Sequence, residues 1–388
     1  MADLPEIDVA LDWVLARARR LPLEDVPVEA SAGRVLGEDA RAVTDLPPFD
    51  SSAMDGFAVR AADTPGELAV VGESAAGSPS DRVLGAGEAI TISTGAVVPR
   101  GADAIVPVER TTGDVVVERV DVGAHVRPRG GDIRVGDLVL AEGTEIRAPQ
   151  LAALAAAGIP TVRCARVPRV AVLSTGTELR RPGDELRPGE IYESNALMLA
   201  AQLVHAGAEP VVLDAVPDDE GALRSALEHA LEQDVVITSG GVSVGPHDLV
   251  RATLAALGAE EVFWRVAVKP GKPVAFAVRG DTLVFGLPGN PVSSLVGFEL
   301  FVRPALGALR GSADPRPTYR HAPLAATVRR DPGRDELMRA RFVDGALDPI
   351  TGQDSHMIAR AALAEALVRI PHGEGEVEAG TQVSYLSI

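Results

Sequence analysis

Apolar runs and helix-like segments alternate through the middle of the chain, between residues 169 and 310. Buried strands are predicted at 170–173, 211–213, 234–238, 274–276 and 283–285, and helices at 195–206, 220–233, 247–257 and 291–309. This alternation is typical of a parallel sheet wound by right-handed crossovers. Asn195 can cap the first helix, and Pro304 should kink or split the last one. We therefore expect a doubly wound, mostly parallel α/β domain.

The hydrophobic pattern is different on both sides of this region. Residues 7–21 place apolar side chains at helical spacing, which predicts one amphipathic helix. Between residues 24 and 146, short apolar runs separated by Gly, Pro and Asp predict short strands, and 148–157 predict a small helix. Short β-like runs return at 324–328, 366–370 and 382–386. We expect four parts: a discontinuous N-terminal α+β domain (1–43 and 132–168), an inserted β domain (44–131), the α/β domain (169–310) and a small C-terminal β domain (311–388).

The net charge narrows the choice of partners. The 388 residues include 37 Lys and Arg against 55 Asp and Glu, which gives a formal net charge of −18. Proteins that bind nucleic acid need clustered basic side chains to neutralise phosphates, and aromatic residues, which stack on bases, make up only 3% of this chain. Nucleic acid is therefore not an expected partner.

Cysteine, histidine and hydropathy exclude further classes of protein. Cys164 is the only cysteine, which excludes a disulfide framework and favours a buried, passive thiol in a strand. The seven histidines lack the His-x-x-x-His spacing of a metal site. We find no apolar stretch of about 18 residues and no secretory signal pattern at the N-terminus. We expect a cytoplasmic protein that does not span a membrane.

The carboxyl ends of the predicted parallel strands should carry the chemistry, because ligands of such sheets bind there. The loop Ser-Gly-Gly-Val-Ser-Val-Gly at 239–245 is the most informative, since its glycines let the backbone approach an anion closely. It is neither a Walker loop nor a dinucleotide-binding loop. The alternative is a tight turn without a ligand, which the neighbouring Ser239, Ser243 and Asp248 disfavour.

Two nearby segments could complete an anion site. The turn Gly-Leu-Pro-Gly-Asn-Pro at 286–291 has a rigid backbone and opens a helix with Pro291, although a stiff helix start would look the same. Upstream, Arg265, Lys269 and Lys272 form a candidate anion clamp in an otherwise acidic chain. A solvated turn is the alternative for these cations.

Five loop carboxylates are candidates for a metal site: Asp55, Asp132, Glu178, Asp218 and Asp248. Each one alone is more simply explained as a turn cap. If they converge, they form a hard-oxygen site that suits Mg²⁺ held between carboxylates and a phosphate.

In their order along the chain, these segments closely resemble the molybdopterin molybdenumtransferase family (MoeA and the E domain of gephyrin). The resemblance runs from about residue 8 to residue 387. It rests on an ordered set of motifs: Ser-Ser-Ala-Met-Asp-Gly-Phe at 51–57, Ser-Thr-Gly-Ala at 93–96, Ser-Thr-Gly-Thr-Glu-Leu at 174–179, the loops at 239–245 and 286–291, and Lys-Pro-Gly-Lys-Pro at 269–273.

The resemblance implies a homodimer whose active site lies between the α/β domain of one chain and the N-terminal β parts of the other. It implies a Mg²⁺-dependent reaction of adenylylated molybdopterin with molybdate, in which the pyrophosphate link is cleaved, AMP is released and molybdenum stays on the dithiolene. A molybdopterin adenylyltransferase would be a further partner.

Site residues follow from the resemblance and the loop chemistry together. Glu178 and Asp218 would hold Mg²⁺, the loop amides would hold a phosphate, and Arg339 and Ser355 would present charge and a hydroxyl to molybdate. The complete set has the catalytic residues Glu178, Asp218, Asp248, Asp55, Asp132 and Thr94, and the substrate-binding residues Ser239, Gly240, Gly241, Ser243, Gly245, Arg265, Lys269, Lys272, Pro288, Pro291, Arg339 and Ser355.

Two other functions fit the same α/β domain. A molybdopterin adenylyltransferase shares it but lacks the flanking β parts, and a non-catalytic molybdopterin-binding scaffold would not need the candidate carboxylates. Because the expected substrates are anions and the net charge is −18, their attraction must be local. We therefore expect binding to depend strongly on Mg²⁺.

Overall fold

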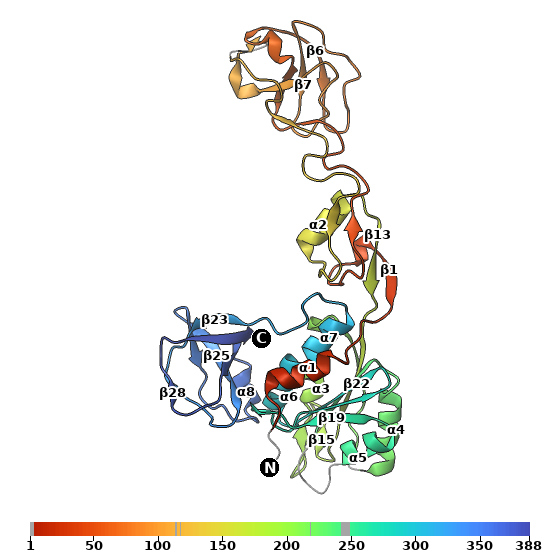
Figure 1. Ribbon diagram of the computed structural model, residues 1–388, viewed down its shortest axis with the longest axis vertical. Coiled ribbons are helices and arrows are strands. Elements are labelled where there is room, and N and C mark those ends of the chain that lie inside the picture. The colour runs from red at the N-terminus through yellow and green to blue at the C-terminus, as the bar shows by residue number, and fades with distance from the viewer. Residues whose placement is uncertain (1–3, 113–114, 117, 218, 242–248) are drawn as a thin grey trace.

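The computed structural model describes residues 4–112, 115–116, 118–217, 219–241 and 249–388. The molecule is elongated (Figure 1). A β lobe that contains β6 (Ala69–Ser74) and β7 (Glu88–Ile92) lies at one end, and a small lobe with α2 (Ala148–Ala156) follows it. The α/β domain and the C-terminal β domain lie side by side at the other end. The β lobe is thus far from the α/β domain of its own chain.

A six-stranded sheet in the order β17-β14-β18-β22-β21-β19 forms the centre of the α/β domain. Its strands are β14 (Arg169–Ser174), β17 (Glu209–Val212), β18 (Val235–Ser239), β19 (Glu260–Trp264), β21 (Ala275–Arg279) and β22 (Thr282–Leu287). The first four strands in this order are parallel, which confirms the predicted fold class, whereas β21 and β19 are antiparallel to their neighbours. The tight turn from β21 to β22 contains Gly280, whose φ of +60° suits a residue without a side chain.

Helices cover both faces of this sheet, because its strands are apolar on both sides. In β14, Val170 and Val172 belong to the same core as α1 (Ile7–Leu15) and α3 (Asn195–His205). Ala171 and Leu173 point the other way and pack with α4 (Glu220–Ala230) and α5 (Leu249–Ala256). The two cores fix the strands, and with them the loops that follow their carboxyl ends.

Several helices end at other residues than predicted; α4, for example, ends at Ala230 rather than at residue 233. α1 ends at Leu15 rather than at residue 21, because the chain then turns so that the Leu21 N–H donates to the Leu309 carbonyl. The predicted helix at 291–309 is split, as expected, into α6 (Pro291–Gly297), a π-helical segment (Phe298–Val302) and α7 (Arg303–Leu309), with Pro304 in the first turn of α7. By length and composition Pro291–Leu309 could cross a membrane, but 78% of it is buried, as in a core helix.

The small lobe is built from segments that are distant in the sequence. β1 (Leu23–Pro27) pairs with β13 (Thr161–Ala165), and β2 (Ala40–Arg41) pairs with β12 (Leu138–Leu140), beside α2 and a 3-10 turn at Val28–Ala30. Cys164 on β13 is fully buried, and burial raises the pKa of its thiol. The expectation of a buried thiol in a strand is therefore confirmed.

The β lobe contains a four-stranded sheet in the order β6-β7-β4-β8, where β4 is Gly56–Val59 and β8 is Ala104–Pro107. A Cβ atom at Gly56 would lie 2.0 Å from the Val106 carbonyl oxygen, so β4 can approach β8 only because residue 56 is glycine. Smaller elements complete the lobe: β3 (Ser51–Ser52), β5 (Gly66–Glu67), β9 (Thr111–Thr112), β10 (Val115–Val116), β11 (Val126–Arg127), and 3-10 turns at Ala61–Asp63 and Val108–Arg110.

The C-terminal domain is joined to the α/β domain through its main sheet, in the order β20-β25-β27-β29-β23 with β26 beside β25. β20 (Val268–Lys269) comes from the α/β part, where β15 (Leu179–Arg180) and β16 (Ile191–Tyr192) also pair. The strand predicted at 324–328 is wrong, since β23 ends before it and β24 begins at its last residue. The remaining elements are β23 (Arg320–Pro323), β24 (Val328–Arg329), β25 (Asp335–Val343), β26 (Ala346–Pro349), α8 (Ile358–Ala361), β27 (Ala366–Ile370), β28 (Glu376–Val377) and β29 (Gln382–Ser387).

A charged cluster fastens the C-terminal domain to α1. The buried Asp335 accepts hydrogen bonds from Arg369 at 2.8 Å and from the His372 N–H at 2.9 Å, and Arg369 also reaches Asp8 on α1. Burial raises the pKa of Asp335, but the bonds from His372 and Arg369 outweigh it and hold the pKa below its ordinary value. Such a carboxylate stabilises the folded state above its unfolded pKa, and the contribution is lost as the pH falls through its folded pKa.

Asp335→Asn should lower the free energy of unfolding by about 3 kcal/mol at pH 7, because Arg369 loses a buried anionic partner. The difference from the wild type should begin to shrink as the pH falls below about 4, where Asp335 is protonated in the unfolded chain, and it should vanish only below the lower pKa of the folded state. Urea unfolding at pH 7 and pH 3 measures both values. Asp348, which pairs with Arg341 nearer the surface, gives the control Asp348→Asn, expected to cost less than about 1 kcal/mol. A penalty for Asp335→Asn that is the same at both pH values would contradict this account.

Candidate active site

The carboxyl ends of β14, β18 and β22 open into a cavity of about 750 Å³. The loops that follow neighbouring parallel strands meet there, as the sheet topology requires. Residues of the C-terminal domain form part of the wall, so two domains share the cavity. The lining residues are 174–176, 178–179, 191–195, 239–241 and 288–291, with Pro273, His356 and Ile358.

The start of the glycine-rich loop enters the cavity as predicted. Gly240 and Gly241 have φ values of +95° and +65°, and a Cβ at Gly240 would lie 2.9 Å from the Thr175 carbonyl oxygen. The backbones approach so closely here only because both residues are glycine. The Gly240 N–H donates to the Leu287 carbonyl at 3.1 Å, so Gly240 shapes the cavity and its N–H is already bonded within the protein.

Two carboxylates line the cavity. Glu178 follows β14, and among the described residues its carboxylate has no hydrogen-bond or ion-pair partner. Glu193, which the sequence analysis missed, accepts the Ser174 hydroxyl at 3.0 Å and the Ala196 N–H at 2.8 Å. Its position just before an apolar helical run is the signal that could have revealed it. Glu178 is therefore free to meet a cation, whereas Glu193 is fixed at the start of α3.

Asn195 connects three segments around the cavity. Its buried side-chain amide donates to Ser239 Oγ at 2.8 Å and to the Gly289 carbonyl at 2.7 Å. Ser194, not Asn195, is the N-cap of α3, so the predicted capping role of Asn195 is wrong. The amide instead ties the first residue of α3 to the loops after β18 and β22.

The three cations of the predicted clamp lie outside the cavity lining. Arg265 stacks over the Trp264 ring at 3.8 Å. Lys269 Nζ lies 3.3 Å from Oε2 of the buried Glu336, so β25 of the C-terminal domain neutralises it. Lys272 is exposed, borders the lining residue Pro273 and has no ion-pair partner among the described residues. Of the three, Lys272 is thus the one next to the cavity lining, where an anion at the rim could reach it.

Arg339 is not a surface cation. It is fully buried on β25, and its guanidinium donates to the Gln353 side chain and to the carbonyls of Gly352, Asp354 and Met357 at 2.9–3.2 Å. Burial lowers the pKa of this guanidinium. The expectation that Arg339 presents its charge to molybdate is therefore wrong, because these bonds direct the guanidinium into the loop at 352–357.

That loop reaches the cavity from the C-terminal domain: His356 lines the cavity, and Ser355 bonds to the lining residue Asn290. Ser355 Oγ accepts a hydrogen bond from Asn290 at 2.8 Å, and the Ser355 carbonyl accepts the Val292 N–H at 3.1 Å. His356, which the sequence analysis did not single out, lines the cavity next to it. Pro288 and Pro291 belong to the wall that the Asn290 turn forms, as predicted.

The candidate residues of the N-terminal half lie elsewhere in the chain. Asp55 Oδ1, in the β lobe, accepts the Thr94 N–H at 2.6 Å, so these two residues meet. Asp132 is exposed in the connection between the β lobe and the small lobe. One chain does not bring Asp55 or Thr94 to Glu178, since their lobe lies at the opposite end of the molecule (Figure 1).

Four predicted residues, Asp218, Ser243, Gly245 and Asp248, lie outside the described residues. Within the described part of the chain no group of three His, Cys, Asp or Glu side chains could hold a metal ion. Mg²⁺ at phosphate sites is commonly held by one or two carboxylates together with the phosphates of the substrate. Glu178 and Glu193 are the described carboxylates of the cavity that fit this mode.

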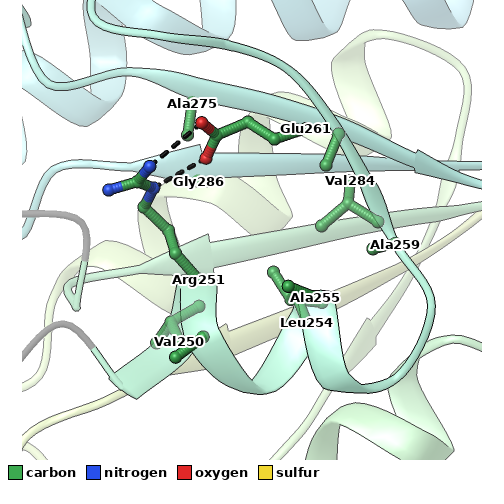
Figure 2. Close-up of a pocket in the computed structure, with 11 residues that line it drawn as sticks. Val250, Arg251, Leu254, Ala255, Ala259, Glu261, Ala275, Val284 and Gly286 are labelled. Atoms are coloured by element: carbon green, nitrogen blue, oxygen red, sulfur yellow. Dashed lines mark hydrogen bonds and ion pairs between the residues drawn. The ribbon is translucent and has the colours of Figure 1, made fainter.

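A second cavity, of about 420 Å³, lies between α5 and the sheet (Figure 2). Small apolar side chains such as Ala255 and Ala275 line it, beside the ion pair of Arg251 with Glu261 at 2.7 Å. It contains none of the predicted site residues, so it is distinct from the cavity at the strand ends.

Comparison with known proteins agrees with this architecture. Residues 6–158 match the MoeA N-terminal region (domains I and II), residues 171–308 match a probable molybdopterin binding domain, and residues 321–388 match the MoeA C-terminal region (domain IV). These three regions together span most of the chain.

Individual relatives match along nearly the whole length. The chain is 39% identical over 380 residues to molybdopterin molybdenumtransferase 2 of Mycobacterium tuberculosis, which covers 92% of this chain and 93% of that protein. It is 35% identical over 402 residues to the molybdopterin molybdenumtransferase of Bacillus subtilis, which covers 98% and 94%. The crystal structure of the molybdopterin biosynthesis moeA protein from Pyrococcus horikoshii superposes with a TM-score of 0.86 at 30% identity and covers 100% of both chains. The resemblance that the ordered motifs indicated is confirmed, and this chain belongs to the MoeA family.

Proposed function

We propose that this chain is a molybdopterin molybdenumtransferase of molybdenum cofactor biosynthesis. The observation that carries the proposal is the cavity at the carboxyl ends of β14, β18 and β22, in a chain that matches the MoeA family over most of its length. Hydroxyl, amide and carboxylate groups converge there on a space large enough for a pterin with a phosphate chain. The shared wall with the C-terminal domain fits an enzyme that needs its flanking domains.

The reaction that fits this site joins adenylylated molybdopterin and molybdate. Water adds to the pyrophosphate link between molybdopterin and AMP, and AMP leaves. The two dithiolene thiols displace one oxygen of molybdate, which leaves with the two thiol protons as water. Ser239 and Lys272 would hold the phosphate groups, and Glu178 would hold Mg²⁺ against them. When bound, Mg²⁺ would neutralise the pyrophosphate and make AMP a better leaving group.

A second copy of the chain would complete the site. Asp55 and Thr94 form a polar pair on a lobe that lies far from the cavity of its own chain. In a two-fold symmetric dimer, the lobe of each chain can approach the cavity of its partner. That the reaction takes place in the cytoplasm, and that a molybdopterin adenylyltransferase delivers the substrate, remain predictions.

Purified protein incubated with adenylylated molybdopterin, molybdate and Mg²⁺ should release AMP and form active cofactor. Omission of Mg²⁺, or Glu178→Ala, should each reduce the rate at least about 100-fold, because the charge of the pyrophosphate is then not neutralised. Chromatography of AMP and reconstitution of a molybdenum enzyme measure the two products. Glu228→Gln, on the surface of α4 and far from the cavity, is the control that should leave the rate unchanged. Tight substrate binding without AMP release would contradict the proposal and support a scaffold.

A further inference from the structure

Two serines occupy equivalent places at the floor of the cavity. Ser174 ends β14 and Ser239 ends β18, and the two are register partners in the parallel pair. Both line the cavity, and both are nearly buried, at 2% and 3% exposed. Their hydroxyls bond to chemically different partners, and this difference determines where each hydroxyl proton points.

Ser174 donates its proton and Ser239 accepts one. Ser174 Oγ lies 3.0 Å from a carboxylate oxygen of Glu193, which can only accept. The Asn195 amide lies 2.7 Å from the Gly289 carbonyl, which also can only accept, so the amide nitrogen must face it. The second hydrogen of the same nitrogen then points at Ser239 Oγ, at 2.8 Å.

The orientation of the Asn195 amide leaves its own oxygen without a hydrogen-bond partner. With the nitrogen held by Gly289 and Ser239, Asn195 Oδ1 is buried and has no hydrogen-bond partner in the described structure. A flipped amide would let Oδ1 accept the Ser239 proton, but it would place Oδ1 against the Gly289 carbonyl oxygen. Two facing acceptors repel each other, so Gly289 keeps the amide in the orientation that leaves the Ser239 proton unused.

We propose that Asn195 is a positioning residue that orients Ser239 as a hydrogen-bond donor to an oxyanion of the substrate. The Ser239 proton has no acceptor among the described residues, and a hydroxyl that accepts one hydrogen bond becomes a stronger donor. The oxyanion is a phosphate oxygen of the molybdopterin adenylate or an oxygen of molybdate. The inference rests on the proposed function, whose substrates are both oxyanions.

The test uses Asn195→Leu, Ser239→Ala and the double variant in the full-length protein. Each single change should raise the KM of the substrate that carries the oxyanion about tenfold or more, since one hydrogen bond to a charged group is lost, while kcat falls less. The substrate whose KM rises, adenylylated molybdopterin or molybdate, identifies the source of the oxyanion. Because Asn195 acts through Ser239, the double variant should have nearly the KM of Ser239→Ala alone.

Two further variants separate this role from a merely structural one. Asn195→Asp has nearly the same shape, but its carboxylate takes the Ser239 proton, so its KM should be at least as high as that of Asn195→Leu. Gln202→Leu removes another α3 amide that also has a buried, unpaired oxygen, but outside the cavity. It should lower thermal stability without a change in KM.

Two results would overturn the inference: an unchanged KM in Asn195→Leu, or KM effects of Asn195→Leu and Ser239→Ala that multiply in the double variant. Complete inactivity of the wild type would instead overturn the proposed function. The inference would then be judged by calorimetric titration with inorganic pyrophosphate, which needs no turnover. An equal Kd for the wild type and Asn195→Leu would overturn it, and a Kd about tenfold higher in the variant would support it.

Discussion

Two inactive variants, Asp55→Asn and Glu178→Ala, should restore activity when they are combined in one dimer. In a dimer of two identical variant chains, either substitution should reduce the rate of AMP release by at least about 100-fold, because both active sites then lack the same carboxylate. If the lobe of one chain completes the cavity of the other, a mixed dimer holds one intact site and one doubly altered site. A purified mixed dimer should therefore have about half the activity of the wild type.

The mixed dimer is obtained by co-expression of the two variants with different affinity tags and by successive purification on both. Asn at position 55 keeps an oxygen that can accept the Thr94 N–H, so the loop geometry of the lobe is preserved. The matched control combines Asp55→Asn with Thr94→Ala, which both lie in the β lobe. This pair damages both sites of every mixed dimer and should stay inactive. Equal recovery in the control, or no recovery in the cross-lobe pair, would show that the site is not shared in this way.

The α/β domain was predictable because its strands are buried on both faces. Runs such as 170–173 and 234–238 are then apolar without interruption, and they alternate with amphipathic helices. The predicted runs at 274–276 and 283–285 are joined by a connection too short for a crossover, so the antiparallel pair of β21 and β22 could have been derived from the sequence. β19 was not predicted as a strand.

The longest C-terminal strand, β25, was missed because its buried positions are charged. Asp335, Glu336 and Arg339 are all nearly or fully buried. A hydropathy pattern assigns charged residues such as these to the surface. Their partners are remote: Arg369 reaches Asp335 across the sheet, and Lys269 reaches Glu336 from the α/β domain. Sequence alone cannot show that such charges are compensated inside the protein.

The same limitation explains which candidate residues the structure places at the cavity. Glycine loops and proline turns were found because their backbone shape is encoded locally, as at Gly240 and Pro291. The surroundings of cations depend on distant partners, so the sequence could not show that Lys269 pairs with Glu336 or that Arg339 is buried. Asn195 illustrates the same point: its local position suggested a helix cap, whereas its side chain bonds to Ser239 and Gly289, which are distant in the sequence.

Replacement of Arg339 should disorder the loop at 352–357 and thereby reduce activity about 100-fold, although Arg339 does not touch the cavity. Arg339→Met fills similar space but leaves the carbonyls of Gly352, Asp354 and Met357 without their donor. We expect the free energy of unfolding to fall by about 3 kcal/mol. Arg339→Lys keeps the charge, but it cannot reach several carbonyls at once, so it should restore little activity. Arg341→Met, on the same strand with its side chain at the surface, is the matched control.

Hydrogen exchange distinguishes this positioning role from direct contact with molybdate. If Arg339 acts through the loop, amides of residues 352–357 should exchange faster in Arg339→Lys than in the wild type, without any ligand present. The Arg339→Lys variant should then bind substrate weakly because Ser355 and His356 are misplaced. Adding Ser355→Ala to this variant should reduce its activity little further. If the loop exchanges at the wild-type rate while activity is lost, Arg339 must reach the substrate in another conformation. The structure favours faster exchange of the loop in Arg339→Lys. The guanidinium is buried and makes four hydrogen bonds to the loop, so it could reach the substrate only if these bonds broke and the loop unfolded locally.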